Sequence, residues 1–397
     1  MSRRPATLPA GRRAALVAAA VVVLALAWGA VRPLPAAAAA PPAPQVDAKA
    51  FVVMDQRTGV VLAAKDPNER LPMASTTKIM TALLALEHFS DLSTVVRAPA
   101  DSVGVGEDEI YLRKGERLTV DQLLMATLIQ SANDAAADLA DAVAGSQKAF
   151  VAMMNAKAAE LGLTNTHYEN PHGLDQPGHY TSASDLTRLA RVAMSDPRFA
   201  GYVDRSTATI PWAGHSYKRI LVSHNTLLED YPWVDGVKTG WTDEAGYCIA
   251  AAGDYHGHQI MVTLLGEPDE SHRVADALAL FKWSATQYAR RSLVTRAAVV
   301  AHADVPYHDE GVSLVTAIAP QAVLRRGAIV TTKITAPTSL SLPVTRGTAY
   351  GTAQFYADGK KVGTVALVAQ RSFAKAGWGT RVGYQVHRAW SWLTSLL

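Results

Sequence analysis

The fold is decided around the stretch Met73-Ala74-Ser75-Thr76-Thr77-Lys78-Ile79-Met80. An apolar run follows it as far as Glu87, and this pattern predicts a helix that Ser75 opens. Positions three apart lie on one face of a helix, so the Ser75 hydroxyl and the Lys78 amine are expected to meet. The start of a helix also supplies free N–H groups and the positive end of the helix dipole. These are the parts of an activated nucleophile.

The Ser-x-x-Lys pattern is weak evidence when it stands alone. At average residue usage it occurs by chance about once or twice in a chain of this length. A second copy, Ser372-Phe373-Ala374-Lys375, has no supporting motif around it. We therefore expect chemistry only at the first copy, because further motifs follow that one.

Length and composition describe a folded protein. At 397 residues the chain is long enough for two domains. Its 49% apolar and 18% charged residues are typical of globular proteins. The net charge of +3 is mild, and a nucleic-acid partner would need a concentrated basic patch, so none is expected. The single cysteine, Cys248, excludes an intrachain disulfide and a cysteine-based zinc cluster, and no other metal site or cofactor is indicated.

Residues 1–40 predict a signal peptide. A basic region precedes an apolar run at 14–31, and an alanine-rich stretch then offers small-residue cleavage sites. We favour cleavage after Ala38 or Ala39, with an uncleaved membrane anchor as the competing interpretation. Both interpretations place the rest of the chain outside the cytoplasm, in the cell envelope. A proline-rich linker at 41–47 follows.

Residues 48–292 predict one α/β (α+β) domain. Runs at 50–54 and 60–63 read as a hairpin at its start, and runs at 247–252 and 259–265 read as a hairpin near its end. Helices are expected between them, one capped by Thr119, and a last helix at 271–290. Strands at both ends with helices between them indicate an antiparallel sheet covered by helices.

The sequence pattern changes after this domain. Short β-branched runs separated by turn residues predict a small all-β domain at 293–380. At 381–397, Val386, Trp390, Leu393 and Leu397 fall at helical spacing. The pattern predicts an amphipathic helix that anchors the protein to a membrane surface. A helix that packs back on the β domain is the competing interpretation.

Two further motifs accompany Ser75. Ser131-Ala132-Asn133 has the form Ser-x-Asn, which occurs by chance about once in such a chain, and Ser223-His224-Asn225 is a second copy. Lys238-Thr239-Gly240 is rarer, about one chance occurrence in ten chains. The order Ser-x-x-Lys, Ser-x-Asn, Lys-Thr-Gly is the triple of β-lactamases and penicillin-binding proteins.

The chain resembles the serine-type D-alanyl-D-alanine carboxypeptidases, the low-molecular-mass penicillin-binding proteins of peptidase family S11. The resemblance rests on the three motifs and on Asn170-Pro171-His172-Gly173-Leu174-Asp175, and it spans most of 48–290. It implies a β-lactamase/transpeptidase-like fold followed by the family's β domain. It also implies that peptidoglycan stem peptides are the substrate, that β-lactam antibiotics inhibit, and that the C-terminal helix binds the membrane surface.

The chemistry of the nucleophile follows from three side chains. Ser75 is expected to attack the carbonyl of the penultimate D-alanine and form an acyl-enzyme. Lys78 must be neutral to accept the proton, which requires a pKa lowered by burial and by a nearby cation such as Lys238. Ser131 is expected to relay a proton to the leaving amine.

Five residues are expected to bind substrate: Asn133, Lys238, Thr239, Gly240 and Trp241. Asn133 holds Lys78 or the substrate amide, and Lys238 with Thr239 binds the terminal carboxylate. The resemblance implies that the residue after Gly240 gives a backbone N–H to the oxyanion hole. That residue is Trp241, where the family often has histidine.

Several interpretations stay open at this stage. A β-lactamase of the same fold needs a glutamate that activates water, and Glu169 stands at the wrong spacing for it. The motifs also fit a D,D-endopeptidase, and a wall-binding module that has lost catalysis would retain the same fold. We expect His172 to be structural, and Glu107 with its acidic neighbours to form a solvated loop. Arg273 is a candidate for carboxylate binding, but we favour a surface arginine at a helix start.

Overall fold

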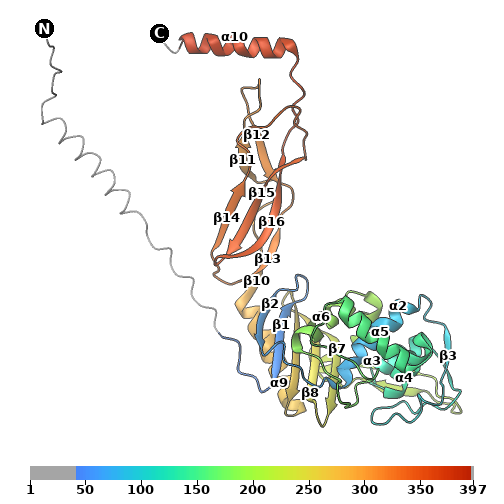
Figure 1. Cartoon of the computed structure of the whole chain (residues 1–397). Helices are drawn as coiled ribbons and strands as arrows, with labels where there is room; N and C mark the ends of the chain where they lie inside the picture. The colour runs from blue at the N-terminus through green and yellow to red at the C-terminus, as the bar shows by residue number, and fades with distance from the viewer. Residues whose placement is uncertain (1–41, 395–397) are drawn as a thin grey trace, which may run out of the picture. The chain divides into compact units, whose positions relative to one another are not determined.

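The computed structural model describes residues 42–394, so the predicted signal peptide and Leu397 lie outside the described residues. A five-stranded antiparallel sheet organises the N-terminal domain, in the order β2-β1-β9-β8-β7 (Figure 1). Both predicted hairpins are present: the first is β1–β2 and the second is β8–β9. The strands are β1 (Ala50–Asp55), β2 (Val61–Lys65), β7 (Val234–Thr242), β8 (Gly246–Tyr255) and β9 (His258–Glu267).

The sheet has a helical layer on each face. Alternate residues of a strand point to opposite faces. In β1, Phe51 and Val53 pack in a cluster that includes Leu280 and Phe281 of α9 (Glu270–Gln287). Val52 belongs instead to the larger cluster formed with the helices of the other face. Figure 1 shows α9 on one side of the sheet and the group α2–α6 on the other.

Local sequence signals account for several helix ends. Thr119 caps α3 through a capping box with Gln122, as the sequence predicts, and Ser182 caps α6. Two boundaries differ from the prediction. Ser75 lies in a 3₁₀ turn before the α-helix starts, and the last helix ends at Gln287 because the chain continues as a strand. The helices are η1 (Ala74–Thr77), α2 (Lys78–His88), α3 (Val120–Leu128), α4 (Asn133–Ala144), α5 (Gln147–Glu160), α6 (Ala183–Ala193), α7 (Pro197–Val203) and α8 (Leu227–Asp230).

Two short hairpins complete this domain. The first is formed by β3 (Val95–Arg97) and β4 (Arg117–Thr119), and the second by β5 (Thr207–Ile210) and β6 (Arg219–Val222). Arg219 of β6 forms a buried ion pair with Glu116, 2.6 Å away. It therefore ties the second hairpin to the loop that precedes β4.

The C-terminal region is rich in β-strands, so the predicted fold class is confirmed. Its main sheet has the order β11-β12-β16-β15-β14, and β10 pairs separately with β13. Leu314, Phe355 and Leu367 lie in its apolar core. The elements are β10 (Tyr288–Ser292), β11 (Val299–Ala303), β12 (Val312–Thr316), β13 (Gln321–Arg325), β14 (Val330–Thr335), β15 (Ala349–Ala357), β16 (Lys360–Ala369) and α10 (Trp378–Thr394).

The last helix, α10, begins three residues before the predicted segment. It has no buried residues, and Val386, Trp390 and Leu393 are all exposed. Within residues 42–394, no helix combines the length and apolar character needed to cross a bilayer.

Candidate active site

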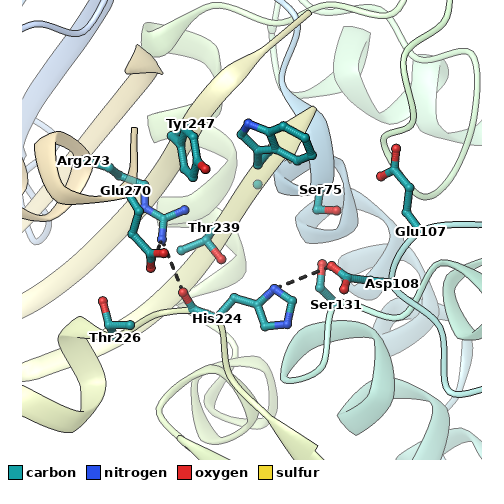
Figure 2. A pocket seen from close by; sticks show the side chains of 12 residues that line it. Ser75, Glu107, Asp108, Ser131, His224, Thr226, Thr239, Tyr247, Glu270 and Arg273 are labelled. Carbon is teal, nitrogen blue, oxygen red and sulfur yellow. Dashed lines mark hydrogen bonds and ion pairs between the residues drawn. The ribbon is translucent and has the colours of Figure 1, made fainter. Parts of the chain in front are cut away.

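A pocket of about 520 Å³ brings the sequence motifs together. Of the predicted site residues, Ser75, Ser131, Thr239, Gly240 and Trp241 line it directly, whereas Lys78, Asn133 and Lys238 are buried. In Figure 2, Arg273 and Glu270 lie at one side and Glu107 and Asp108 at the other. The full lining is Ser75, Glu107, Asp108, Ser131, His224, Thr226, Thr239, Gly240, Trp241, Tyr247, Glu270 and Arg273.

Ser75 is held on a tightly packed turn. Gly240 of β7 approaches so closely that a Cβ there would lie 2.7 Å from the Ser75 nitrogen. Gly173, at φ +103°, presses against the turn from another side, and its Cβ would lie 2.0 Å from the Ala74 oxygen. Larger residues at these two positions would displace the nucleophile, so both glycines are required by close approach.

Lys78 begins α2 and points its amine at Ser75. The two atoms Lys78 Nζ and Ser75 Oγ are 2.8 Å apart, as the three-residue spacing predicts. The amine also donates to Asn133 Oδ1 at 2.6 Å and to the His172 carbonyl at 2.7 Å. Because a neutral amine has two N–H groups, these carbonyl oxygens occupy both. The remaining lone pair then faces the Ser75 hydroxyl, which is the geometry of a general base.

The surroundings of Lys78 favour its neutral form. Its side chain is fully buried, and this burial lowers the pKa of the amine well below its usual value. The positive charge of Lys238 lowers it further, while Asp108 and Glu107 act in the opposite direction. Burial is the largest cause, so the predicted direction and both predicted causes are confirmed.

Asn133 orients the amine. It is the first residue of α4, and its Nδ2 donates to the Gly106 carbonyl at 2.8 Å. That bond fixes the amide so that Oδ1 faces Lys78. Of the two predicted partners, Asn133 holds Lys78. Ser131, two residues earlier, has φ +66° and lines the pocket.

β7 is an edge strand of the sheet and carries the third motif, Lys238-Thr239-Gly240. It ends the sheet order, so its outer edge pairs with no strand among residues 42–394. Lys238 is buried, and its Nζ donates to the Thr239 carbonyl at 2.9 Å. Burial lowers the pKa of Lys238 to about 7; Asp108 raises it and Arg273 lowers it. An edge strand with a cation and a hydroxyl suits an extended peptide with a free carboxylate.

Three residues that sequence reasoning placed on the surface belong to the pocket. Arg273 is only 4% exposed; its Nη2 donates to Glu270 at 3.0 Å, so the prediction of a surface arginine is wrong. Glu107 and Asp108 line the pocket, so they are not simply a solvated loop. No local pattern marks Glu107 and Asp108, whereas Arg273 falls at helical spacing with buried residues of α9 such as Ala277 and Phe281.

His172 and Glu169 play no part in the pocket lining. Lys78 contacts the His172 carbonyl rather than its ring, and burial lowers the pKa of that ring to about 3. Glu169 lies in a separate cavity with His172 and Asn170. The water-activating glutamate that a β-lactamase needs is therefore missing from this position.

Comparison with known proteins decides the family. The family model described as D-alanyl-D-alanine carboxypeptidase matches residues 36–268, more than half of the chain. The chain belongs to this family of S11 serine peptidases. A second family model, described as the C-terminal domain of penicillin-binding protein 5, matches residues 288–375. Together the two matches span the strands of both domains among residues 42–394.

Relatives of this carboxypeptidase family match over most of their length. The D-alanyl-D-alanine carboxypeptidase DacF of Bacillus subtilis is 33% identical over 84% of this chain and 88% of its own. The D-alanyl-D-alanine carboxypeptidase DacC of Escherichia coli is 31% identical over 86% of this chain and 88% of its own. The crystal structure of penicillin-binding protein 5 from Haemophilus influenzae has the same fold, with a TM-score of 0.70 at 24% identity, covering 84% of this chain and all of that one.

Proposed function

We propose that Ser75 is the nucleophile that removes the terminal D-alanine from peptidoglycan stem peptides, with Lys78 as its general base. The proposal is supported above all by the Lys78 amine. It lies 2.8 Å from Ser75 Oγ, and carbonyl oxygens occupy its other bonds. Ser75 gives its proton to Lys78 as its oxygen bonds to the penultimate D-alanine carbonyl carbon.

The pocket orients the substrate by charge. Lys238, Thr239 and Arg273 lie together and suit the terminal carboxylate. We assign the oxyanion hole to the backbone N–H groups of Ser75 and Trp241, because both residues line the pocket. Ser131 relays the proton that Lys78 accepted to the D-alanine nitrogen as the bond from this nitrogen to the carbonyl carbon breaks, which leaves Lys78 neutral again. Water then hydrolyses the Ser75 ester and regenerates the Ser75 hydroxyl. A β-lactam enters as an analogue of the dipeptide and leaves slowly.

A peptide ending in D-Ala-D-Ala tests the proposed reaction. The purified protein should release free D-alanine from it, and Ser75→Ala should abolish the release. A matched peptide ending in L-Ala-L-Ala serves as the control and should stay intact. Release by the Ser75→Ala variant at the wild-type rate would overturn the assignment of the nucleophile.

We also propose that α10 binds the outer face of the cytoplasmic membrane, after export by the N-terminal signal peptide. Support comes from one stripe of the helix, where Val382, Val386, Trp390 and Leu393 are exposed at spacings of three to four residues. Arg381 and Arg388 add positive charge for anionic lipid. The full chain should sediment with anionic phospholipid vesicles, and a chain that lacks residues 378–397 should stay in solution. Equal sedimentation of the two forms would contradict the anchor.

A further inference from the structure

A relay of three hydrogen bonds, through the side chains of His179 and Thr77, ends on the peptide group that contains the Ser75 N–H. Glu169 N–H donates to His179 Nδ1 at 3.0 Å. His179 Nε2 and Thr77 Oγ1 are 2.8 Å apart, and Thr77 Oγ1 donates to the Ala74 carbonyl at 2.8 Å. Both linking side chains are buried, with exposed fractions of 6% for His179 and 0% for Thr77.

The donor and the acceptor of every hydrogen bond in this relay are fixed. A backbone N–H only donates, so His179 Nδ1 must accept from Glu169 and carries no proton. The ring proton therefore lies on Nε2 and is donated to the Thr77 oxygen. The single hydroxyl proton of Thr77 is left for the Ala74 carbonyl, which only accepts. Each donor has one acceptor, and no different arrangement satisfies all three bonds.

The last bond controls the oxyanion hole. The Ala74 C=O and the Ser75 N–H belong to one planar peptide unit, in which the two groups point in opposite directions. Fixing the carbonyl oxygen therefore fixes the direction of the N–H. Ala74 needs such support, because its φ of +48° is unfavourable for a residue with a side chain. The Ser75 nitrogen lies against Gly240 of β7, the residue that precedes Trp241.

We propose that His179 is a positioning residue that, through Thr77, aims the Ser75 N–H at the developing oxyanion. The proposal rests on the proposed roles of Ser75 and of its N–H. Burial lowers the pKa of His179 to about 4; His167 and Lys78 also lower it, and Asp175 raises it. The ring is thus neutral at pH 7, as an accepting Nδ1 requires. The oxyanion forms only in the transition state, so loss of the relay should lower kcat and leave KM nearly unchanged.

Two substitutions of His179 separate positioning from packing. Asparagine retains a polar atom near the place of Nδ1, and glutamine retains a donor near the place of Nε2. Both remove the ring. His179→Asn should lower kcat for a peptide ending in D-Ala-D-Ala by about tenfold to a hundredfold. His179→Gln should stay within about threefold of wild type, because it still donates to Thr77.

Thr77→Val tests the same relay without touching the histidine. It should lower kcat as His179→Asn does, and the double variant should be no worse than either single one. The neighbouring Thr76 provides a matched control, because it is equally buried and donates to the Met73 carbonyl at 2.6 Å. Thr76→Val should lose similar thermal stability but keep kcat within about threefold.

The outcomes separate the relay from the proposed reaction. Equal loss in His179→Asn and His179→Gln, additive losses in the double variant, or an effect on KM alone would overturn the relay. Should His179→Asn fail to fold, Thr77→Val against Thr76→Val gives the same answer. If Ser75→Ala is inactive while the relay variants match wild type, only the relay is wrong. If Ser75→Ala remains active, the proposed reaction itself fails.

Discussion

The chain contains the same four-residue pattern twice, and only one copy forms a site. Ser75 and Lys78 lie on a helical turn, their reactive atoms are 2.8 Å apart, and the amine is buried. Ser372 and Lys375 are both exposed and not helical, and the Ser372 hydroxyl accepts from the backbone of Arg346. A helical turn and burial, rather than spacing in the sequence, therefore create the nucleophile and its base.

Substitution of the two serines should give the sharpest contrast. Ser75→Ala should reduce release of D-alanine by about 10⁴-fold or more, because it removes the attacking oxygen. Ser372→Ala should leave kcat/KM and labelling by a fluorescent penicillin unchanged. Steady-state kinetics and gel fluorescence of the two variants measure this difference. Similar losses of activity in both variants would contradict the assignment of the nucleophile to Ser75 alone of the two serines.

Substitution of the two lysines should give a smaller contrast. Lys78→Met keeps the length of the side chain but removes the base, and kcat should fall by about 10³-fold. Lys375→Met alters only an exposed side chain and should have no effect on kcat. Thermal unfolding of both variants serves as the folding control. Wild-type acylation by folded Lys78→Met would show that another group takes the proton.

The pH dependence of kcat/KM should report the ionisation of the two buried lysines, Lys78 and Lys238. Because the pKa of Lys78 is lowered, kcat/KM should rise with pH on the acid side as Lys78 becomes neutral. Lys238, whose pKa is lowered to about 7, loses its charge as the pH rises through that value. The kcat/KM for an anionic substrate should then fall by about tenfold per pH unit. A C-terminal amide of the same peptide should lack this alkaline fall; the same fall with both peptides would exclude Lys238 as its cause.

Ion pairs in the two regions should differ in their effect on stability. Glu116 and Arg219 are buried, and Glu116→Ala should lower the free energy of unfolding by about 3 kcal/mol by leaving a buried charge unpaired. Glu310 and Arg371 form a 2.8 Å pair beside the second motif, with side chains 80% and 48% exposed. Glu310→Ala should cost at most about 0.5 kcal/mol. Denaturant titration compares the two variants, and equal losses would contradict the role given to burial.

Local patterns were enough for part of the site. The contact between Ser75 and Lys78 follows from helical spacing, and the cap at Thr119 follows from residue type. The order of the three motifs indicated the family, and the family match confirms it. Apolar runs separated by short turns predicted both hairpins of the sheet, because such runs are typical of buried strands.

The rest depends on contacts between distant residues. The His172 carbonyl that binds Lys78 lies 94 positions away, and His179 lies 102 positions from Thr77. Arg273 reaches the pocket from α9, where it lies on the buried face with Ala277 and Phe281, although arginine is usually an exposed residue type. No short pattern encodes such contacts, since the packing of the loop and the sheet creates them.

Mapping the site of acylation is the decisive test of Ser75 as the nucleophile. The wild-type protein is incubated with a penicillin, quenched in acid, digested and analysed by mass spectrometry. We expect one covalent adduct, on Ser75, and an unmodified peptide containing Ser372. An adduct on any other residue, or turnover of the D-Ala-D-Ala peptide without acylation of Ser75, would contradict it.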